Sequence, residues 1–176
     1  MKLTDLLPLE KWVELEKEVT RRSGLDVSVF NTNGIRITDF RQWANNLCPA
    51  IKATDKGQSF ICAVAHMNLA EQARQTRKSV IEECDAGLLK LVVPIFAGDE
   101  FLGAFGGCGY LLDDGEVDTF MINKTTDIEE EEIERLSQDI KAISTDEAES
   151  LVRYISDEIE KIIRGQGVRN ILISHL

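Results

Sequence analysis

The sequence predicts an α+β fold in which an antiparallel sheet of about five strands is flanked by helices. The predicted helices and strands do not alternate regularly along the chain, and this disfavours a doubly wound parallel sheet. Turn residues at Asn33–Gly34 and Gly98–Asp99 join neighbouring strands, as in β-hairpins. We expect the helices to lie on one side of the sheet.

The N-terminal segment predicts one helix followed by a β-hairpin. Apolar residues at helical spacing predict a helix over residues 8–22, which Gly24 ends. Apolar and polar residues then alternate over residues 25–30, a pattern typical of a strand. The turn at residues 31–34 leads into a return strand at residues 35–37.

The middle of the chain predicts a second helix and three more strands. Residues 41–56 look irregular, apart from one helical turn over residues 44–48. Apolar positions at helical spacing predict a helix over residues 57–78. The strands that follow are expected at residues 80–81, 88–96 and 100–112, the last of them rich in glycine.

The C-terminal third is predicted to be helical. Short helices are expected over residues 117–124 and 128–143. A longer helix is expected over residues 146–164, with Thr145 as its N-cap and Gly165–Gly167 at its end. We expect the first 145 residues to form one domain, residues 146–165 a separate helix and residues 166–176 a tail.

Composition excludes several classes of protein. The 176 residues suit one domain with a sizeable core. The net charge of −11 would repel a phosphate backbone, so we expect no nucleic-acid partner. We find neither an apolar run that could cross a membrane nor a signal peptide, and therefore expect a cytoplasmic protein with reduced thiols.

Four cysteines, Cys48, Cys62, Cys84 and Cys108, are the main candidates for a functional site. They lie in four different segments, and no two form the close pair that zinc ribbons use. One interpretation is that they are inert thiols or line a pocket. The alternative is that all four are ligands of a zinc ion or an iron–sulfur cluster.

Several short sequence motifs, in a fixed order, resemble those of a known family. The motifs are Leu47-Cys48-x-x-Ile51, Cys62 on a helix that ends near Ala70 to Ala73, Cys84-Asp85-Ala86-Gly87-Leu88, Pro94-Ile95 and Leu102-Gly103-Ala104 before a glycine-rich strand. Over roughly residues 5 to 145 this order resembles the PocR-type ligand-binding domain of bacterial signalling proteins. The resemblance implies a PAS-like fold, in which an antiparallel sheet cups a pocket for a small molecule.

The resemblance also implies the class of ligand and marks two departures from the family pattern. Family members sense small organic molecules such as short diols or related hydrocarbon derivatives. Asp85 replaces a histidine that is usual in the family, and Cys108-Gly109 replace a frequent Gly-Gln. Both departures fall where a ligand is expected, and Cys108 adds a fourth sulfur to the three that the family commonly carries.

Three other side chains have a functional and a structural interpretation. Asp85 either accepts a hydrogen bond from a ligand hydroxyl or caps the turn at Ala86–Gly87. Trp43 either forms one wall of the pocket or fills the core. His66 lies on the same helix face as Cys62, either as a further ligand or as an ordinary histidine.

These observations predict a sensory module that is not an enzyme, because the sequence contains no Gly-x-Gly-x-x-Gly, no P-loop and no Gly-x-Ser-x-Gly motif. It would bind a small ligand in a pocket lined by Trp43, Cys48, Cys62, Cys84, Asp85 and Cys108. The alternative is a metal or iron–sulfur redox sensor. The last helix would relay occupancy to a homodimer mate or a downstream signalling protein, because its apolar residues repeat at a spacing of three to four. This apolar seam of the last helix either pairs with the same seam of a second copy of the chain, which we favour, or packs on its own domain.

Overall fold

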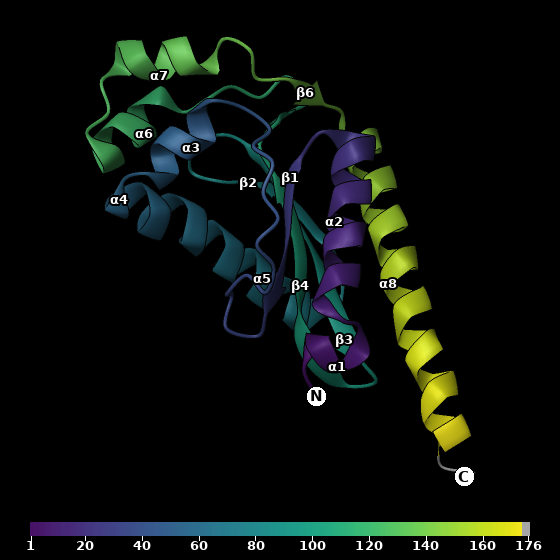
Figure 1. Ribbon diagram of the computed structural model, residues 1–176. Coiled ribbons are helices and arrows are strands. Elements are labelled where there is room, and N and C mark those ends of the chain that lie inside the picture. The colour runs from purple at the N-terminus through teal and green to yellow at the C-terminus, as the bar shows by residue number, and fades with distance from the viewer. Residues whose placement is uncertain (174–176) are drawn as a thin grey trace.

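The computed structural model describes residues 1–173, with side chains described through residue 165. Its centre is a four-stranded antiparallel sheet in the order β1-β4-β3-β2 (Figure 1). The strands are β1 (Asp26–Asn31), β2 (Val80–Glu83), β3 (Leu89–Ala97) and β4 (Glu100–Cys108). The predicted α+β, PAS-like fold is confirmed.

The predicted return strand at residues 35–37 is much reduced. It follows the outer edge of β1 through a single bridge between Phe30 and Arg36. Two main-chain hydrogen bonds flank the bridge, from Asn31 to Ile35 and from Ile37 to Val29. The sheet therefore has four regular strands and a short fifth segment beside β1.

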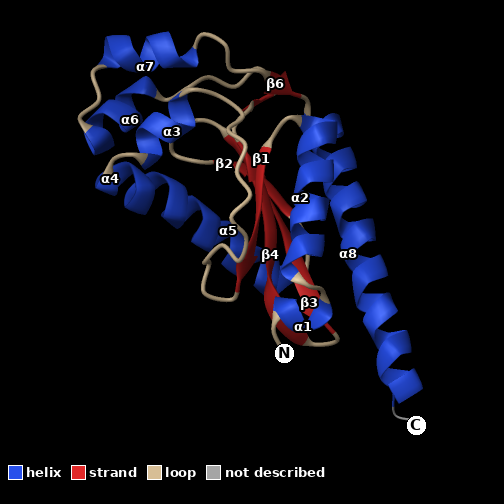
Figure 2. Ribbon diagram, in the orientation of Figure 1, coloured by secondary structure: helices blue, strands red, loops and turns tan. Residues whose placement is uncertain are grey.

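Helices cover both faces of the sheet, so the expectation of helices on one side is wrong (Figure 2). One face is covered by α2 (Leu9–Ser23) and α8 (Thr145–Ile173), with the short α1 (Leu3–Leu6) nearby. The other is covered by α5 (Val64–Thr76). The physical reason is that β3 is buried along most of its length, and a strand that is apolar on both faces needs cover on both.

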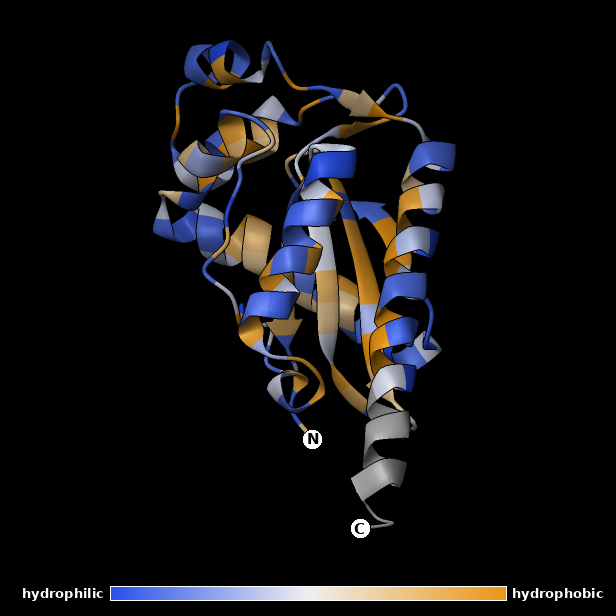
Figure 3. Ribbon diagram, turned by 45° about the vertical axis from the view of Figure 1, so that its right-hand side comes forward, coloured by the Kyte–Doolittle hydropathy of each residue, from blue (hydrophilic) through white to orange (hydrophobic). Residues whose placement is uncertain are grey.

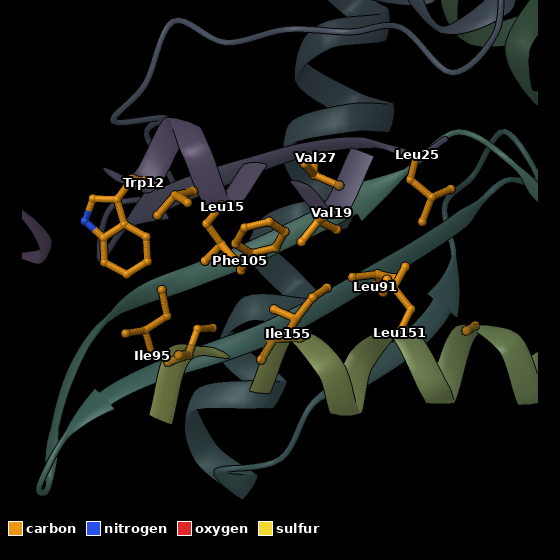
Figure 4. Packing of buried hydrophobic residues seen from close by; sticks show 14 of the residues in the cluster. Trp12, Leu15, Val19, Leu25, Val27, Leu91, Ile95, Phe105, Leu151 and Ile155 are labelled. Carbon is orange, nitrogen blue, oxygen red and sulfur yellow. The ribbon is translucent and has the colours of Figure 1, made fainter. Parts of the chain in front are cut away.

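The larger core lies between the sheet, α2 and α8. Alternation in the strands turns Val27, Leu91 and Phe105 toward the helices, where they meet Trp12 and Ile155 (Figure 4). The apolar stripes of α2 and α8 are turned toward the sheet (Figure 3). Each such buried side chain contributes about 1.5–3 kcal/mol, so this face supplies most of the stability.

The segment predicted as one helix over residues 57–78 consists of three pieces. They are α4 (Asp55–Gly57), a π-helix η1 (Gln58–Ala63) and α5. The preceding segment, which was expected to be irregular, contains α3 (Leu47–Lys52). Together these pieces form a wall that stands over the upper part of the sheet (Figure 1).

Two predictions in the C-terminal half are wrong. The helix expected over residues 128–143 is α7 (Glu130–Ser137), after α6 (Thr119–Thr126). Its last two expected residues instead form β6 (Ala142–Ile143), which pairs in parallel with β5 (Leu111–Leu112). The strand predicted over residues 100–112 is interrupted at Gly109, whose φ of 112° no regular strand adopts.

Helix α8 differs from its prediction at both ends. Ser144, and not Thr145, is its N-cap, because Ser144 Oγ accepts a hydrogen bond from the Glu147 amide and the Glu147 carboxylate accepts one from the Ser144 amide. The predicted stop at Gly165–Gly167 is also wrong, since the helix continues to Ile173. Residues 174–176 of the predicted tail lie outside the described residues. Within the described part of the chain, no helix is both long and apolar enough to cross a membrane.

Candidate functional site

A cavity of about 350 Å³ lies between the sheet and the wall of α3, η1 and α5. All four cysteines line it, so segments that are far apart in the sequence bring Cys48, Cys62, Cys84 and Cys108 to one place. The volume is at the low end of the range for ligand sites, which suits a small metabolite.

The sheet forms the floor of the cavity, and one row of residues crosses it. Asp26 of β1, Cys108 of β4 and Lys90 of β3 are direct partners in the strand register. Residues that are paired across antiparallel strands point to the same face, so these three side chains lie next to each other. Asp26 and Lys90 are buried, and the Cys108 thiol lies 3.8 Å from the carbonyl oxygen of Asp26.

Asn45 holds Cys48 against the end of β4. Its side-chain amide donates to the Gly109 carbonyl at 2.6 Å and to the Cys48 sulfur at 3.3 Å, and its oxygen accepts from the Cys48 amide. A Cβ at Gly109 would lie 2.6 Å from the Ala44 Cβ, so only glycine allows this approach. The Cys108-Gly109 departure thus lies at a contact between the wall and the floor.

The π-helix η1 positions Cys62, and α5 positions His66. π-Helices occur often at functional sites, and here the wider turn faces the cavity. The His66 ring is only 4% exposed and stacks on Phe30 at 3.7 Å between ring centroids. Neither of its ring nitrogens has a hydrogen-bond partner in the described structure, which marks them as candidate ligand contacts.

The motif Cys84–Leu88 forms a tight turn that places Cys84 at the cavity. Main-chain hydrogen bonds join Cys84 to Leu88 and Gly87 to Cys84. Gly87 has a φ of 80°, and a Cβ there would lie 2.1 Å from the Glu116 carbonyl oxygen, so the turn requires glycine. Asp85 is exposed on the outside of this turn and is not among the residues that line the cavity.

Trp43 also lies outside the cavity, at 38% exposure, but it contacts two side chains that line it. The Arg41 guanidinium is 4.3 Å and the Lys52 ammonium 5.6 Å from the centre of a Trp43 ring. Such cation–π contacts orient the two cations. Trp43 is thus placed to act on the cavity indirectly.

Burial keeps three of the cavity thiols protonated. It raises the pKa of Cys48 and Cys84, and it raises the pKa of Cys62 to about 11. Burial, helped by the charges of Lys90 and Lys52, lowers the pKa of His66 to about 3, so its ring is neutral. At neutral pH these thiols and the imidazole are therefore uncharged.

The metal hypothesis meets a geometric obstacle. In residues 1–173, no three His, Cys, Asp or Glu side chains form a group that could hold a metal ion. The four cysteines line one cavity, but no three of them form such a group among the described residues.

Sequence reasoning missed the charged residues of the cavity, which are Asp26, Arg36, Arg41, Lys52 and Lys90. The sequence pattern could have pointed to two of these residues. Lys90 is the only charged residue in the predicted strand over residues 88–96, and Asp26 lies next to the apolar residues of the predicted strand over residues 25–30. Charged residues are rarely buried without a partner or a role, so both positions were worth attention.

The fold and the cavity define a structural class, namely a PAS-like sheet with a cavity of small-molecule size on one face. The comparison with known families supports this class. The chain matches the sensory domain found in PocR over residues 5–166, almost its whole length, and belongs to that family. The match includes most of α8. No curated protein and no solved structure gives a significant match.

Proposed function

We propose that this domain senses a small molecule in the cysteine-lined cavity and relays its occupancy through α8. The observation that supports binding most directly is the convergence of all four cysteines and the unpartnered His66 on one small cavity. Membership of a sensory family supports the same function and favours a protein that is not an enzyme.

Strand β3 offers a physical route for the relay. It carries Lys90 on its cavity face and Leu91 and Val93 on the opposite face, where Ile155 and Ile159 of α8 pack. A ligand that shifts β3 would therefore change the packing of α8, and a shift between two arrangements of that helix would be the signal.

The predicted dimer requires a surface other than the α8 seam. Ala148, Leu151, Ile155 and Ile159 of that seam are buried against their own domain, as the alternative interpretation proposed. A homodimer mate and a downstream signalling protein stay predictions, which size-exclusion chromatography with light scattering and co-purification would test.

Thermal and urea unfolding with candidate small molecules tests the binding function. A ligand at a hundredfold excess over its dissociation constant should stabilise the domain by about 2.7 kcal/mol. Cys62→Phe should abolish the gain by filling the cavity. Ser59→Phe, on the exposed side of the same π-helix, is the matched control and should keep it.

The metal alternative has its own measurement. Protein purified without oxygen would be examined by visible spectroscopy and elemental analysis. One outcome is zinc or iron in stoichiometric amount that is lost when both Cys48 and Cys108 are changed to serine. That result would replace the ligand-pocket proposal with a metal centre. Metal-free protein with four titratable thiols would support the pocket.

A further inference from the structure

The charges around the cavity are strongly unbalanced. Four cationic side chains line it, Arg36, Arg41, Lys52 and Lys90, against one carboxylate, Asp26. The whole chain has 31 acidic and 20 basic residues, so this local excess of positive charge runs against the overall composition. The neutral thiols of Cys48, Cys62 and Cys84 do not offset it.

The one carboxylate does not neutralise these cations. The closest pair joins Arg41 Nη1 and Asp26 Oδ2 at 3.4 Å, and Asp26 Oδ1 has no hydrogen-bond partner in the described structure. Lys90 is only 8% exposed, yet no described carboxylate lies within ion-pair distance of its ammonium group. The Lys90 ammonium lies 5.5 Å from the centre of the Phe30 ring, and an anionic group of a ligand would give it an ionic partner.

Three side chains converge over Gly106 of β4. A Cβ at this position would lie 3.6 Å from Lys90 Nζ and 3.5 Å from His66 Nδ1, with the Phe30 ring 3.1 Å away. A ligand oxygen in the cavity beside this convergence would be close to one ammonium group and one imidazole nitrogen. His66 is buried and neither of its nitrogens is partnered, so it is free to contact such an oxygen.

We propose that the ligand is a small organic carboxylate, whose carboxylate group lies in the cavity between Lys90 and His66. Its apolar part would contact Phe30, Leu88 and the thiols that line the remaining space. A hydroxyl group beside the carboxylate would also engage His66, since a neutral imidazole has one donor and one acceptor nitrogen. This proposal rests on the ligand-binding function and names the chemical class of the ligand.

Matched pairs of ligands test the proposal. Lactate and 1,2-propanediol have the same carbon skeleton and differ only in a carboxylate against a hydroxymethyl group. 3-Phenyllactate and 3-phenyl-1,2-propanediol extend the comparison to a ligand with a larger apolar part. Titration calorimetry and thermal melting at pH 7.5 should show tighter binding of the acid than of the diol, and added salt should weaken the binding of the acid.

Variants locate the carboxylate. Lys90→Met should weaken binding of the acid about tenfold or more and leave the diol unaffected. Lys17→Met removes the same charge from the exposed surface of α2 and should change neither. Gly106→Ala would crowd the Phe30 ring and the side chains of Lys90 and His66, and it should weaken binding of the acid while the protein still melts cooperatively.

The outcomes separate the class of ligand from the function. If a diol binds as tightly as its matched acid, or if Lys90→Met binds the acid unchanged, the carboxylate proposal is overturned and the sensory function stands. If neither member of either pair shifts the melting temperature, the ligand-binding function and the carboxylate proposal are both overturned.

Discussion

At the scale of single residues, the cavity is built from side chains that are costly to bury. Lys90, Asp26 and His66 are buried, and Asp26 Oδ1 and both ring nitrogens of His66 have no hydrogen-bond partner in the described structure. The Lys90 ammonium faces the Phe30 ring at 5.5 Å. Stability alone would favour apolar residues at these positions, because a buried group without a partner is unfavourable. Their presence fits a site whose contacts are completed by a ligand.

His66 makes the stability of the domain depend on pH. Its pKa falls from 6.5 to about 3 on folding. Below pH 6.5 the unfolded chain takes up a proton that the folded protein does not, so stability is lost as the pH falls from 6.5 toward 3. Between pH 7 and pH 5 the loss should be about 2 kcal/mol, at 1.36 kcal/mol per pH unit.

Urea unfolding at both pH values, with His66→Phe as the reference, measures this loss. The variant keeps a ring to stack on Phe30 but cannot titrate. Burial raises the pKa of Glu16 and Asp26, and this acts in the opposite direction in both proteins, so the difference between them isolates His66. Equal pH dependence in wild type and variant would contradict a neutral, buried His66.

At the scale of elements, sequence patterns predicted what local periodicity controls. The helix ended by Gly24 and the strand at residues 25–30 were located nearly to the residue, because one period dominates each of them. Residues 138–143 were not, since Ile140 and Ile143 continue the helical spacing while the main chain turns to pair with β5. That pairing depends on a contact with residues about 30 positions earlier, which no local pattern contains.

The residues of the candidate site also fall into those that the sequence could predict and those that it could not. The four cysteines were predictable because the sequence is sparse in cysteine, and chemistry singles them out. The cations were not, because Arg36 lies in a predicted return strand and Arg41 and Lys52 lie in a segment predicted to be irregular. Their common position follows from the packing of α3 and the 31–36 turn over the sheet, which is a tertiary property.

Gly165 is a weak position in the helix α8. It is helical, and a Cβ there would meet nothing within 4 Å. Gly165→Ala should therefore stabilise the helix by about 1 kcal/mol, because alanine loses less backbone entropy. Hydrogen exchange of the α8 amides should slow in the variant. Unchanged or faster exchange would show that the helix is not continuous through this residue.

At the scale of the whole molecule, two unequal layers share one sheet. The face toward α2 and α8 holds the large apolar core, while the face toward η1 and α5 holds a cavity with charged and sulfur-bearing walls. Stability is thereby separated from binding. Substitutions on the cavity face should alter ligand affinity with modest effects on folding, and the core face should show the reverse.

The cavity thiols should be slow to react in the folded protein. At pH 8, a pKa of about 11 leaves Cys62 about a hundredfold less thiolate than its ordinary value of 9.0 would. Cys48 and Cys84, with raised pKa values, should also be protected. Iodoacetamide labelling followed by mass spectrometry would compare each cysteine in buffer and in urea. Equal rates of labelling in the two conditions would contradict the cavity.

The π-helix η1 has a consequence for how this domain can vary. Each residue turns an α-helix by about 100°, so one residue gained or lost within residues 58–63 would rotate everything before it relative to α5. Cys62 would then be exchanged for a neighbour, while His66 and the sheet stayed in place. A single-codon insertion or deletion there would give one wall of the cavity a new chemistry without a new fold.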